Sequence, residues 1–233
     1  MLFAQRFASH DIFALFAASL NGLQRQMPTD AEEFEKALRE HARAFGVETD
    51  DRMVSRLSEY YRLVMKWNPR LHLVAPCTAQ QFATRHVLES LIVLPHVAPN
   101  AHIVDIGPGA GLPSIPCLIV REDIHATLIE SSKRKAVFLT EALRELELAN
   151  RAEVIPARFQ DIAAPPADAF MCRALERFES ALTKLIEWAP SGSSLLLFGG
   201  ERLLTALQAL LPDAQAELIP SSQRRLLIIA STK

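Results

Sequence analysis

The spacing of apolar residues changes before the middle of this chain. Up to that point apolar residues recur every three or four positions, which is the period of an amphipathic helix. The pattern predicts helices over residues 31–45, 50–67 and 80–94. Asn68-Pro69 is expected to end the second helix, because a residue that precedes proline is disfavoured in the helical conformation.

Beyond residue 100, short runs rich in β-branched residues alternate with helical segments. Strands are predicted at residues 102–106, 125–130, 152–156, 168–173, 193–198, 215–220 and 225–231. We expect helices between the first five strands, as at 133–146 and 176–188. The turn-like Pro220-Ser221-Ser222 predicts that the last two strands pair antiparallel.

This alternation indicates an α/β fold with a doubly wound, mostly parallel seven-stranded sheet of the Rossmann-like type. A helical extension precedes the sheet. We expect three parts: an extension without a clear pattern over residues 1–30, a helical region over 31–99, and the sheet domain over 100–233.

Composition and charge narrow the class of protein. The chain has 233 residues, of which 49% are hydrophobic, so it can form a large core and is not disordered as a whole. Its net charge of -2 means that any nucleic-acid contact must come from a local basic patch. Three distant cysteines without a C-x-x-C motif predict reduced thiols in the cytoplasm and no metal site.

No apolar run reaches the ~18 residues that a membrane-spanning helix needs. Residues 12–18 form a short apolar segment after Arg6, which weakly resembles a signal peptide. Asp11 interrupts that segment's approach. We therefore favour an N-terminal extension of a soluble protein.

The first predicted strand runs directly into Gly107-Pro108-Gly109-Ala110-Gly111. Glycine lets a ligand approach the backbone, and the first turn of such a sheet is a ligand site. The third glycine, Gly111, comes one residue earlier than in the dinucleotide fingerprint G-x-G-x-x-G. With Asp105 two residues before Gly107, this spacing is typical of an S-adenosylmethionine-binding turn. Asp105 would organise the loop or meet the amino acid end of the cofactor through water.

A second carboxylate supports this interpretation. Glu130 ends the second predicted strand, 25 residues after Asp105, and can accept a hydrogen bond from each ribose hydroxyl. NAD-dependent enzymes use the same contact, so Glu130 alone does not distinguish the cofactors. A surface glycine turn without a ligand is the remaining alternative.

Three segments in this order resemble the GidB family: Lys66-Trp67-Asn68, Arg85-His86-Val87-Leu88-Glu89-Ser90, and the glycine turn continuing into Leu112-Pro113. The resemblance runs from about residue 32 to the end. Members of this family are bacterial methyltransferases that modify N7 of one guanine in small-subunit (16S) ribosomal RNA. The resemblance implies S-adenosyl-L-methionine as cofactor and ribosomal RNA or the small ribosomal subunit as partner.

The resemblance also implies roles for single residues. Gly107 and Leu112 would contact the cofactor, and Arg158-Phe159-Gln160 would flank its adenine. Arg173 would lie near the reacting centre, where it would also touch the cofactor. Arg224 would contact RNA or phosphate at the final hairpin.

The chain departs from the family pattern at several positions. The family's threonine in the glycine turn is Pro108, its following glycine is Ser114, and its Asn-Leu-Thr segment reads His72-Leu73-Val74. The family's aspartate in the histidine motif and its glutamate beside adenine are replaced by Glu89 and Gln160. A Lys-Gly pair after the fifth strand is Gly199-Gly200, which removes a cation from the cleft.

Methyl transfer to guanine N7 needs positioning more than proton transfer, because N7 carries a lone pair and no proton. Arg173 and Asn68 are candidates to hold guanine O6, with a salt bridge and a helix cap as their structural alternatives. Four aromatic side chains could stack on a flipped base, although core packing is favoured for each: Tyr60, Tyr61, Trp67 and Phe159.

An RNA substrate predicts a basic surface. Candidates for RNA contact are Lys66, Arg85, His86 and Arg224, and further basic residues lie in the second helix and after Glu130: Arg52, Arg56, Arg62, Arg70 and Lys133-Arg134-Lys135. A solvated helix face is the favoured alternative for the charges of the second helix, and an ordinary local ion pair explains Arg85, His86 and Glu89 without a function.

The leading hypothesis is an RNA methyltransferase that acts as a monomer in the cytoplasm. A methyltransferase on a small molecule or protein is the first alternative, favoured by the near-neutral charge. A non-catalytic RNA- or ribosome-binding relic of the family is the second. An oxidoreductase is disfavoured by the glycine spacing.

Overall fold

The computed structural model describes residues 29–173 and 178–232. The predictions for residues 1–28 and 174–177 lie outside this part. Before the sheet come the helical segments α2 (Asp30–His41), η1 (Ala42–Phe45), α3 (Asp51–Leu71), α4 (Ala79–Phe82), η2 (Ala83–Leu88), α5 (Glu89–Leu91) and η3 (Leu94–His96). Of these, η1 and η3 are 3-10 helices and η2 is a π-helical turn.

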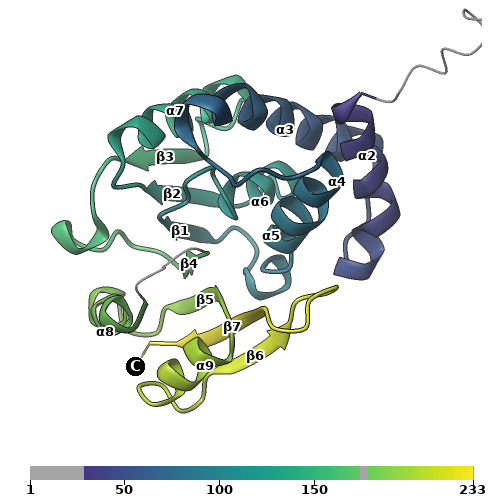
Figure 1. Ribbon diagram of the computed structural model, residues 1–233. Coiled ribbons are helices and arrows are strands. Elements are labelled where there is room, and N and C mark those ends of the chain that lie inside the picture. The colour runs from purple at the N-terminus through teal and green to yellow at the C-terminus, as the bar shows by residue number, and fades with distance from the viewer. Residues whose placement is uncertain (1–28, 174–177, 233) are drawn as a thin grey trace, which may run out of the picture.

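The described strands form one seven-stranded sheet with the order β3-β2-β1-β4-β5-β7-β6 (Figure 1). They are β1 (His102–Ile106), β2 (His125–Ile129), β3 (Ala152–Ile155), β4 (Ala169–Cys172), β5 (Ser194–Gly199), β6 (Gln215–Leu218) and β7 (Leu226–Ser231). The first five strands pair in parallel, and β7 pairs antiparallel with both β5 and β6. The predicted fold class is thereby confirmed, and each strand limit was predicted to within two residues.

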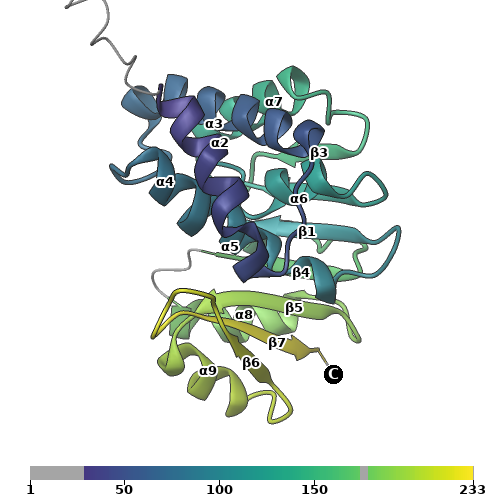
Figure 2. The same cartoon turned by 90° about the vertical axis from the view of Figure 1, so that its right-hand side faces the viewer.

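Helices cover both faces of the sheet. On one face lie α3, α6 (Ser114–Val120) and α7 (Lys133–Glu145), and on the other lie α8 (Phe178–Trp188) and α9 (Glu201–Gln208) (Figures 1 and 2). Successive residues of a strand point to opposite faces, so Ile103 belongs to the first core and Val104 to the second. Both faces are buried, which explains the nearly continuous apolar character of the central strands.

The helical region shares its core with the first face of the sheet. Phe34 of α2, Tyr60 of α3 and Phe82 of α4 are completely buried in the same cluster as Ile103 and Leu128. Figure 2 shows α2 lying across the other N-terminal helices rather than apart from them. Burial of these aromatic rings fixes the helices on the sheet, because the hydrophobic effect scales with the apolar area removed from water.

Two predicted helix limits are wrong. Helix α3 does not stop at Asn68-Pro69 but continues to Leu71 and ends where His72 turns left-handed at φ 49°. Proline in the last turn removes only one hydrogen bond, so the helix tolerates it there. The segment predicted as one helix over 80–94 instead changes from α4 into the π-helical turn η2 and then into α5. A π turn inserts one residue without disturbing the apolar stripe strongly enough to be recognised in sequence.

The connection from β3 to β4 was also predicted wrongly. We expected a helix there, and the structure has only the 3-10 turn η4 (Phe159–Asp161) followed by extended chain. Proline and alanine dominate this stretch, and Pro165-Pro166 is incompatible with a helix interior. Within residues 29–173 and 178–232 there is no helix that is both long and apolar enough to cross a bilayer.

Phe82 provides a test of the shared core. Its ring is fully buried and contacts the rings of Phe34, Tyr60, Tyr61 and His86. We expect Phe82→Ala to lower the free energy of unfolding by about 3–5 kcal/mol through lost contacts and a residual cavity. Urea denaturation measures this change. As a control, Val137→Ala on exposed surface should alter stability by less than about 0.5 kcal/mol; equal effects would contradict the shared core.

Candidate functional site

Three strand ends meet at one edge of the sheet. In the observed register Asp105 lies opposite Leu128 of β2 and opposite Met171 of β4. Two residues further along each strand come Gly107, Glu130 and Arg173. The three predicted site residues therefore lie side by side at the carboxyl edge, which is where doubly wound sheets bind ligands.

The glycines of the first turn serve different purposes. Gly107, Gly109 and Gly111 all have positive φ, at 68°, 58° and 91°. A Cβ atom on Gly111 would lie 2.3 Å from the Ile115 side chain, so this glycine permits close packing on α6. A Cβ on Gly107 or Gly109 would meet no atom within 4 Å. Open space above these two glycines is available to a ligand that approaches the backbone.

Asp105 lies beneath this turn and is completely buried. Its Oδ2 accepts a hydrogen bond from the backbone amide of Ser114 (3.1 Å), and its Oδ1 has no hydrogen-bond partner within the described residues. Burial raises the pKa of Asp105 to about 7, against the opposing effects of the Ser114 hydrogen bond and the Arg173 charge. Asp105 thus holds the start of α6 beneath the turn and retains one acceptor oxygen without a partner in the described residues, while its role toward a cofactor stays a prediction.

Glu130 joins the first turn to the second strand. One carboxylate oxygen accepts from the Gly109 amide (3.1 Å), and the other accepts from the Ser132 amide (2.8 Å). Each oxygen has a further lone pair, so the carboxylate can still accept two hydroxyl groups. Only 5% of Glu130 is exposed, and the two amide contacts hold it in place beside the glycines.

The helical region reaches the same turn through α3. The hydroxyl of Tyr60 donates a hydrogen bond to the carbonyl oxygen of Ala110 (3.0 Å), between Gly109 and Gly111. Burial raises the pKa of this tyrosine, which keeps it protonated as a donor. A helix outside the sheet domain therefore fixes the path of the glycine turn.

Arg173 is the most connected side chain of the site. Its Nη1 donates to the carbonyl oxygen of His86 (2.8 Å) and to Oγ of Ser90 (2.9 Å). Its Nη2 donates to the carbonyl oxygen of Arg85 and forms an ion pair with Glu89 (3.3 Å). The π-helical turn η2 exposes these carbonyls, so a cation from β4 stabilises an irregular helix of the N-terminal region.

Glu89 is the buried counter-ion of two arginines. It pairs with Arg173 and with Arg225, while only 3% of its side chain is exposed. Burial raises the pKa of Glu89, and the two guanidinium groups oppose this effect. Arg224 was the arginine predicted to act at the final hairpin, and the role of Arg225 was not predicted. The alternation of side chains along a strand could have suggested one of the two for an inward position, but not which one.

His86 lies within this cationic group. Its ring packs on Phe82, and its Nδ1 lies 3.5 Å from Nη2 of Arg173. Burial lowers the pKa of His86 to about 4, reinforced by the charges of Arg173, Arg85 and Arg225. The imidazole is therefore neutral at pH 7 and adds no positive charge for RNA.

The segment predicted to flank adenine follows β3. Arg158 and Gln160 are exposed, whereas the ring of Phe159 is buried against Trp188 at 5.3 Å between ring centroids. Leu112 is also buried, two residues before α6. Any contact from Phe159 to a cofactor must therefore use its backbone, and this role remains a prediction.

Two predicted residues lie apart from the arginine cluster. The side-chain oxygen of Asn68 accepts from the Val74 amide (3.0 Å) and fixes the chain after α3, which is the structural role weighed against catalysis. Lys66 is exposed in a groove with Glu59, Arg62 and Glu145. The aromatic candidates are buried or partly buried: Tyr60, Tyr61 and Phe159 in the cores, and Trp67 against Phe138.

Helix α3 carries less unpaired positive charge than its sequence suggests. Arg52 pairs with Glu122 at 2.7 Å, and Arg56 donates to the carbonyl oxygen of Leu146. Arg62 pairs with Glu35 at 3.6 Å. These contacts support the alternative of an ordinary solvated helix face.

The described residues fit the methyl donor that the sequence predicts. Its adenosine and amino acid groups need a turn that leaves the backbone accessible, an acceptor for the ribose hydroxyls and an acceptor for the ammonium group. Gly107 and Gly109 supply the first, Glu130 the second, and Asp105 the buried acceptor beneath them. No group of three or more His, Cys, Asp or Glu side chains in the described ranges could hold a metal ion.

Comparison with known proteins assigns a family. The model of the GidB family, described as rRNA small subunit methyltransferase G, matches residues 53–226. A protein of Xanthomonas axonopodis pv. citri named ribosomal RNA small subunit methyltransferase G is 36% identical over 166 residues, 71% of this chain and 73% of that protein. Its namesake in Yersinia enterocolitica is 33% identical over 178 residues, 76% of this chain and 82% of that protein.

Solved structures agree on the fold. A putative transferase from Pyrococcus horikoshii superposes with a TM-score of 0.51 at 17% identity, over 62% of both chains. TYW2 from the same organism, solved in complex with MeSAdo, gives a TM-score of 0.50 at 18% identity, over 64% of this chain and 63% of that one. At such identities the likeness concerns the fold alone.

The depressed pKa of His86 makes a prediction about stability. The unfolded chain, with a histidine pKa near 6.5, binds more protons between pH 4 and 6.5 than the folded chain does. Stability from neutral His86 is therefore complete above pH 6.5 and is lost as pH falls toward 4. We compare the unfolding free energies of the unmodified protein and of His86→Gln. Their difference should rise by up to about 3 kcal/mol as the pH increases from 4 to 6.5.

Urea denaturation at pH 4.5 and at pH 7 measures this difference. Asp105 titrates in the opposite sense, but it is present in both proteins and cancels. His125→Gln, at an exposed strand end, controls for loss of a histidine as such. A difference that does not change with pH would contradict the burial argument.

Proposed function

Because the chain belongs to the GidB family of rRNA small subunit methyltransferase G, we propose that it transfers a methyl group from S-adenosylmethionine to N7 of a guanine in small-subunit ribosomal RNA. The observation that carries this proposal is the open glycine turn between Glu130 and Arg173 at the carboxyl edge of the sheet. The names of the relatives favour this reading over a methyltransferase for small molecules or proteins.

Residues at the carboxyl ends of β1 and β2 bind the cofactor in this proposal. Glu130 is held by the Gly109 and Ser132 amides and accepts the ribose hydroxyls with its remaining lone pairs. Gly107 and Gly109 leave the backbone open, and Asp105 supports the turn from below through its bond to the Ser114 amide. Leu112 packs beneath, and the backbone of residues 158–160 lines the adenine.

The chemistry requires alignment and no proton transfer. S-adenosylmethionine supplies an electrophilic methyl group on a sulfonium centre. Guanine N7 attacks with its own lone pair, so the protein has to hold N7 about 3–3.5 Å from the methyl carbon and in line with it. The site accordingly contains buried positioning groups rather than a nucleophile paired with a base.

Arg173 is the candidate to orient the guanine, because it follows β4 at the same edge of the sheet as Gly107. Its guanidinium already contacts Ser90 and Glu89, so holding O6 requires it to exchange one of these contacts. Asn68 was proposed for the same task, but its bond to Val74 makes it a weaker candidate than Arg173.

The proposed partner is ribosomal RNA or the small ribosomal subunit. The reaction would then take place in the cytoplasm. We propose that the enzyme acts as a monomer, since one copy of the chain supplies every residue named. Arg85 and Arg224 are exposed and suited to RNA contact. Lys66 is exposed in the groove beside Glu145 and would be a separate RNA contact, and the neutral His86 would contribute only through its shape.

Transfer of labelled methyl groups tests the function directly. The substrate is 16S ribosomal RNA, naked or in small subunits, from a strain that lacks this protein. We expect one labelled guanine, mapped by cleavage at the modified base. Cofactor binding without any label would exclude the RNA methyltransferase and leave the non-catalytic relic. Label on another nucleotide would exclude the N7 assignment alone.

Gly109→Val tests the cofactor site. A branched side chain would occupy the open space of the turn and strain a backbone with φ 58°. Calorimetry should detect no binding of S-adenosylmethionine at concentrations that saturate the unmodified protein. Gly192→Val is the matched control, because Gly192 also has positive φ (82°) and open surroundings but precedes β5 at the opposite edge. Equal affinities in the two variants would refute the assignment.

Arg173→Ala separates positioning from binding. Loss of the guanidinium removes the group beside Gly107 but no group that holds the ribose. We expect the rate of methyl transfer at saturation to fall by roughly 100-fold, as for loss of a group that acts in the transition state, while the cofactor dissociation constant rises less than about 5-fold. Arg173→Lys should recover part of the rate. Equal losses in rate and affinity would assign Arg173 to binding alone.

A further inference from the structure

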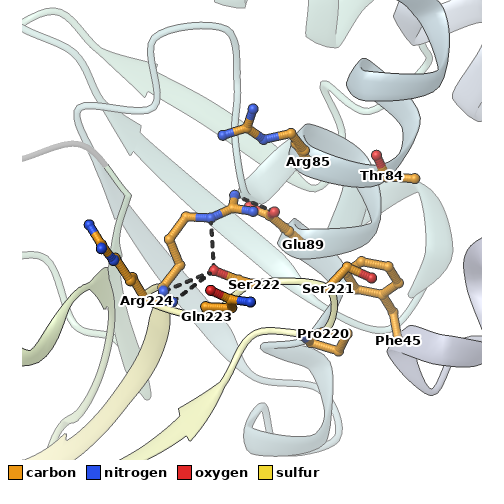
Figure 3. A pocket seen from close by; sticks show the side chains of 10 residues that line it. Phe45, Thr84, Arg85, Glu89, Pro220, Ser221, Ser222, Gln223 and Arg224 are labelled. Carbon is orange, nitrogen blue, oxygen red and sulfur yellow. Dashed lines mark hydrogen bonds and ion pairs between the residues drawn. The ribbon is translucent and has the colours of Figure 1, made fainter.

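One buried carboxylate joins the final hairpin to the edge of the sheet where the glycine turn lies. Oε2 of Glu89 pairs with Nη2 of Arg173 at 3.3 Å, and Oε1 of Glu89 pairs with Nη1 of Arg225. Glu89 extends from α5 above the hairpin turn that contains Ser222 (Figure 3). Because each oxygen serves a different arginine, the orientation of the carboxylate depends on both.

The hairpin holds Arg225 in a fixed position. Arg225 precedes β7, and the next residue, Leu226, pairs with Gly199 at the end of β5. The backbone amide of Arg225 donates to Oγ of Ser222 (3.0 Å), and Nε of Arg225 donates to the same oxygen (3.3 Å). Backbone and guanidinium are thus tied to one turn, so the group that reaches Glu89 has little freedom.

Arg225 also keeps contact with water. It lines a cavity of about 600 Å³ between the hairpin turn and the N-terminal helices, and 36% of its side chain is exposed. Taking a charge out of water is costly, and Arg225 avoids part of that cost, whereas only 15% of the Arg173 side chain is exposed. Arg225 can therefore stabilise the buried Glu89 at a lower cost than a buried cation would.

Glu89 depends on this second cation. Burial raises the pKa of Glu89, and the charges of Arg173 and Arg225 oppose that effect. Charge-assisted hydrogen bonds between nitrogen and a carboxylate are typically about 2.7–2.9 Å long, so the 3.3 Å contact with Arg173 is a loose one. Without Arg225, this loose contact would be the ion pair left to Glu89 within the described residues. The carboxylate could then rotate in its site.

The guanidinium of Arg173 responds to the position of Glu89. Its other contacts in the described ranges are with neutral acceptors, namely the carbonyl oxygens of Arg85 and His86 and the side chains of His86 and Ser90. Glu89 is its ion-pair partner in the same ranges. A change in the orientation of Glu89 therefore loosens Nη2 of Arg173.

We propose that Arg225 is a positioning residue of the site: the hairpin holds Arg225, Arg225 orients Glu89, and Glu89 holds the guanidinium of Arg173 at the carboxyl edge of the sheet. The part of Arg173 in methyl transfer rests on the proposed function. Arg225 touches neither cofactor nor guanine in this arrangement. It sets the orientation in which Arg173 meets the guanine.

NMR of the arginine side chains tests the positioning without any methyl transfer. In protein that carries ¹⁵N-labelled arginine, the signals of Arg173 are identified by their loss in Arg173→Lys. Both Nη atoms of Arg173 donate to fixed partners, so rotation of the guanidinium should be slow. In Arg225→Gln we expect the two Nη signals to exchange about 3–10-fold faster, the factor that corresponds to one lost hydrogen bond.

Transfer rates test what this positioning does for the reaction. At saturating cofactor and 16S ribosomal RNA, we expect Arg225→Gln to lower the rate by roughly 5–20-fold, because a displaced guanidinium orients the base less well. The dissociation constant of S-adenosylmethionine should change by less than about 2-fold, which also shows that the variant is folded. Arg225→Lys keeps a cation without the planar fork and should recover part of the rate.

A second background separates positioning from general stability. In Arg173→Ala there is no guanidinium left to hold, so adding Arg225→Gln should lower the remaining rate by less than about 2-fold. If Arg225 acted only through stability of the hairpin, its effect would be the same in both backgrounds. Arg144→Gln is the matched control, because it removes an arginine from an exposed ion pair with Glu141. It should alter neither the Arg173 signals nor the rate.

The outcomes separate this inference from the proposed function. Arg173 signals that exchange equally fast in Arg225→Gln and in the unmodified protein would overturn the inference, whether or not methyl groups are transferred. An unchanged transfer rate in Arg225→Gln, or an equal loss of rate in both backgrounds, would overturn it too. If the Arg173 signals change while the unmodified protein labels no RNA, the positioning of Arg173 by Arg225 stands and the proposed reaction fails.

Discussion

A buried guanidinium holds the site together. The guanidinium group of Arg173 is buried at the end of β4. Burial lowers its pKa, and the negative charge of Glu89 opposes this effect. Such a group is tolerated only where its donors are satisfied, and here they go to carbonyls of η2, to Ser90 and to Glu89. Because those partners belong to the N-terminal helices, the sheet and the helical region can adopt only one relative arrangement with this cation paired.

The glycine turn is held by separate contacts that do not involve Arg173. Tyr60 reaches from α3 to the carbonyl of Ala110, and Asp105 receives the Ser114 amide from α6. The turn is thus fixed on two sides by buried hydrogen bonds, while Gly107 and Gly109 remain open on the third. A backbone that is already ordered binds a ligand without the entropy cost of ordering a loop. This saving increases the affinity of rigid sites. The helical region is therefore part of the cofactor site rather than an appendage.

Sequence alone identified the sheet, its strands and the adjacent strand-end residues, because β-branched runs and glycine spacing are local signals. It could not identify η2, since a π turn differs from an α-helix by one inserted residue. It also did not identify Arg225 as the arginine that pairs with Glu89, or the bond between Asn68 and the Val74 amide. Which of two neighbouring arginines turns inward, and whether an asparagine caps its own loop, depends on long-range packing that no local pattern encodes.

The glycine pair at the end of β5 shows how a departure in sequence can be absorbed by geometry. A Cβ on Gly200 would lie 3.2 Å from the Arg224 carbonyl, and one on Gly199 would lie 2.3 Å from Leu203. The absence of side chains lets the hairpin approach closely, and this brings Arg225 onto Glu89. Arg225 thus supplies a cation near the end of β5, where the family pattern has lysine, from the residue before β7, whose Leu226 pairs with Gly199. Glu89, in place of the family's aspartate, pairs with both Arg225 and Arg173, so one buried carboxylate is the counter-ion of both arginines.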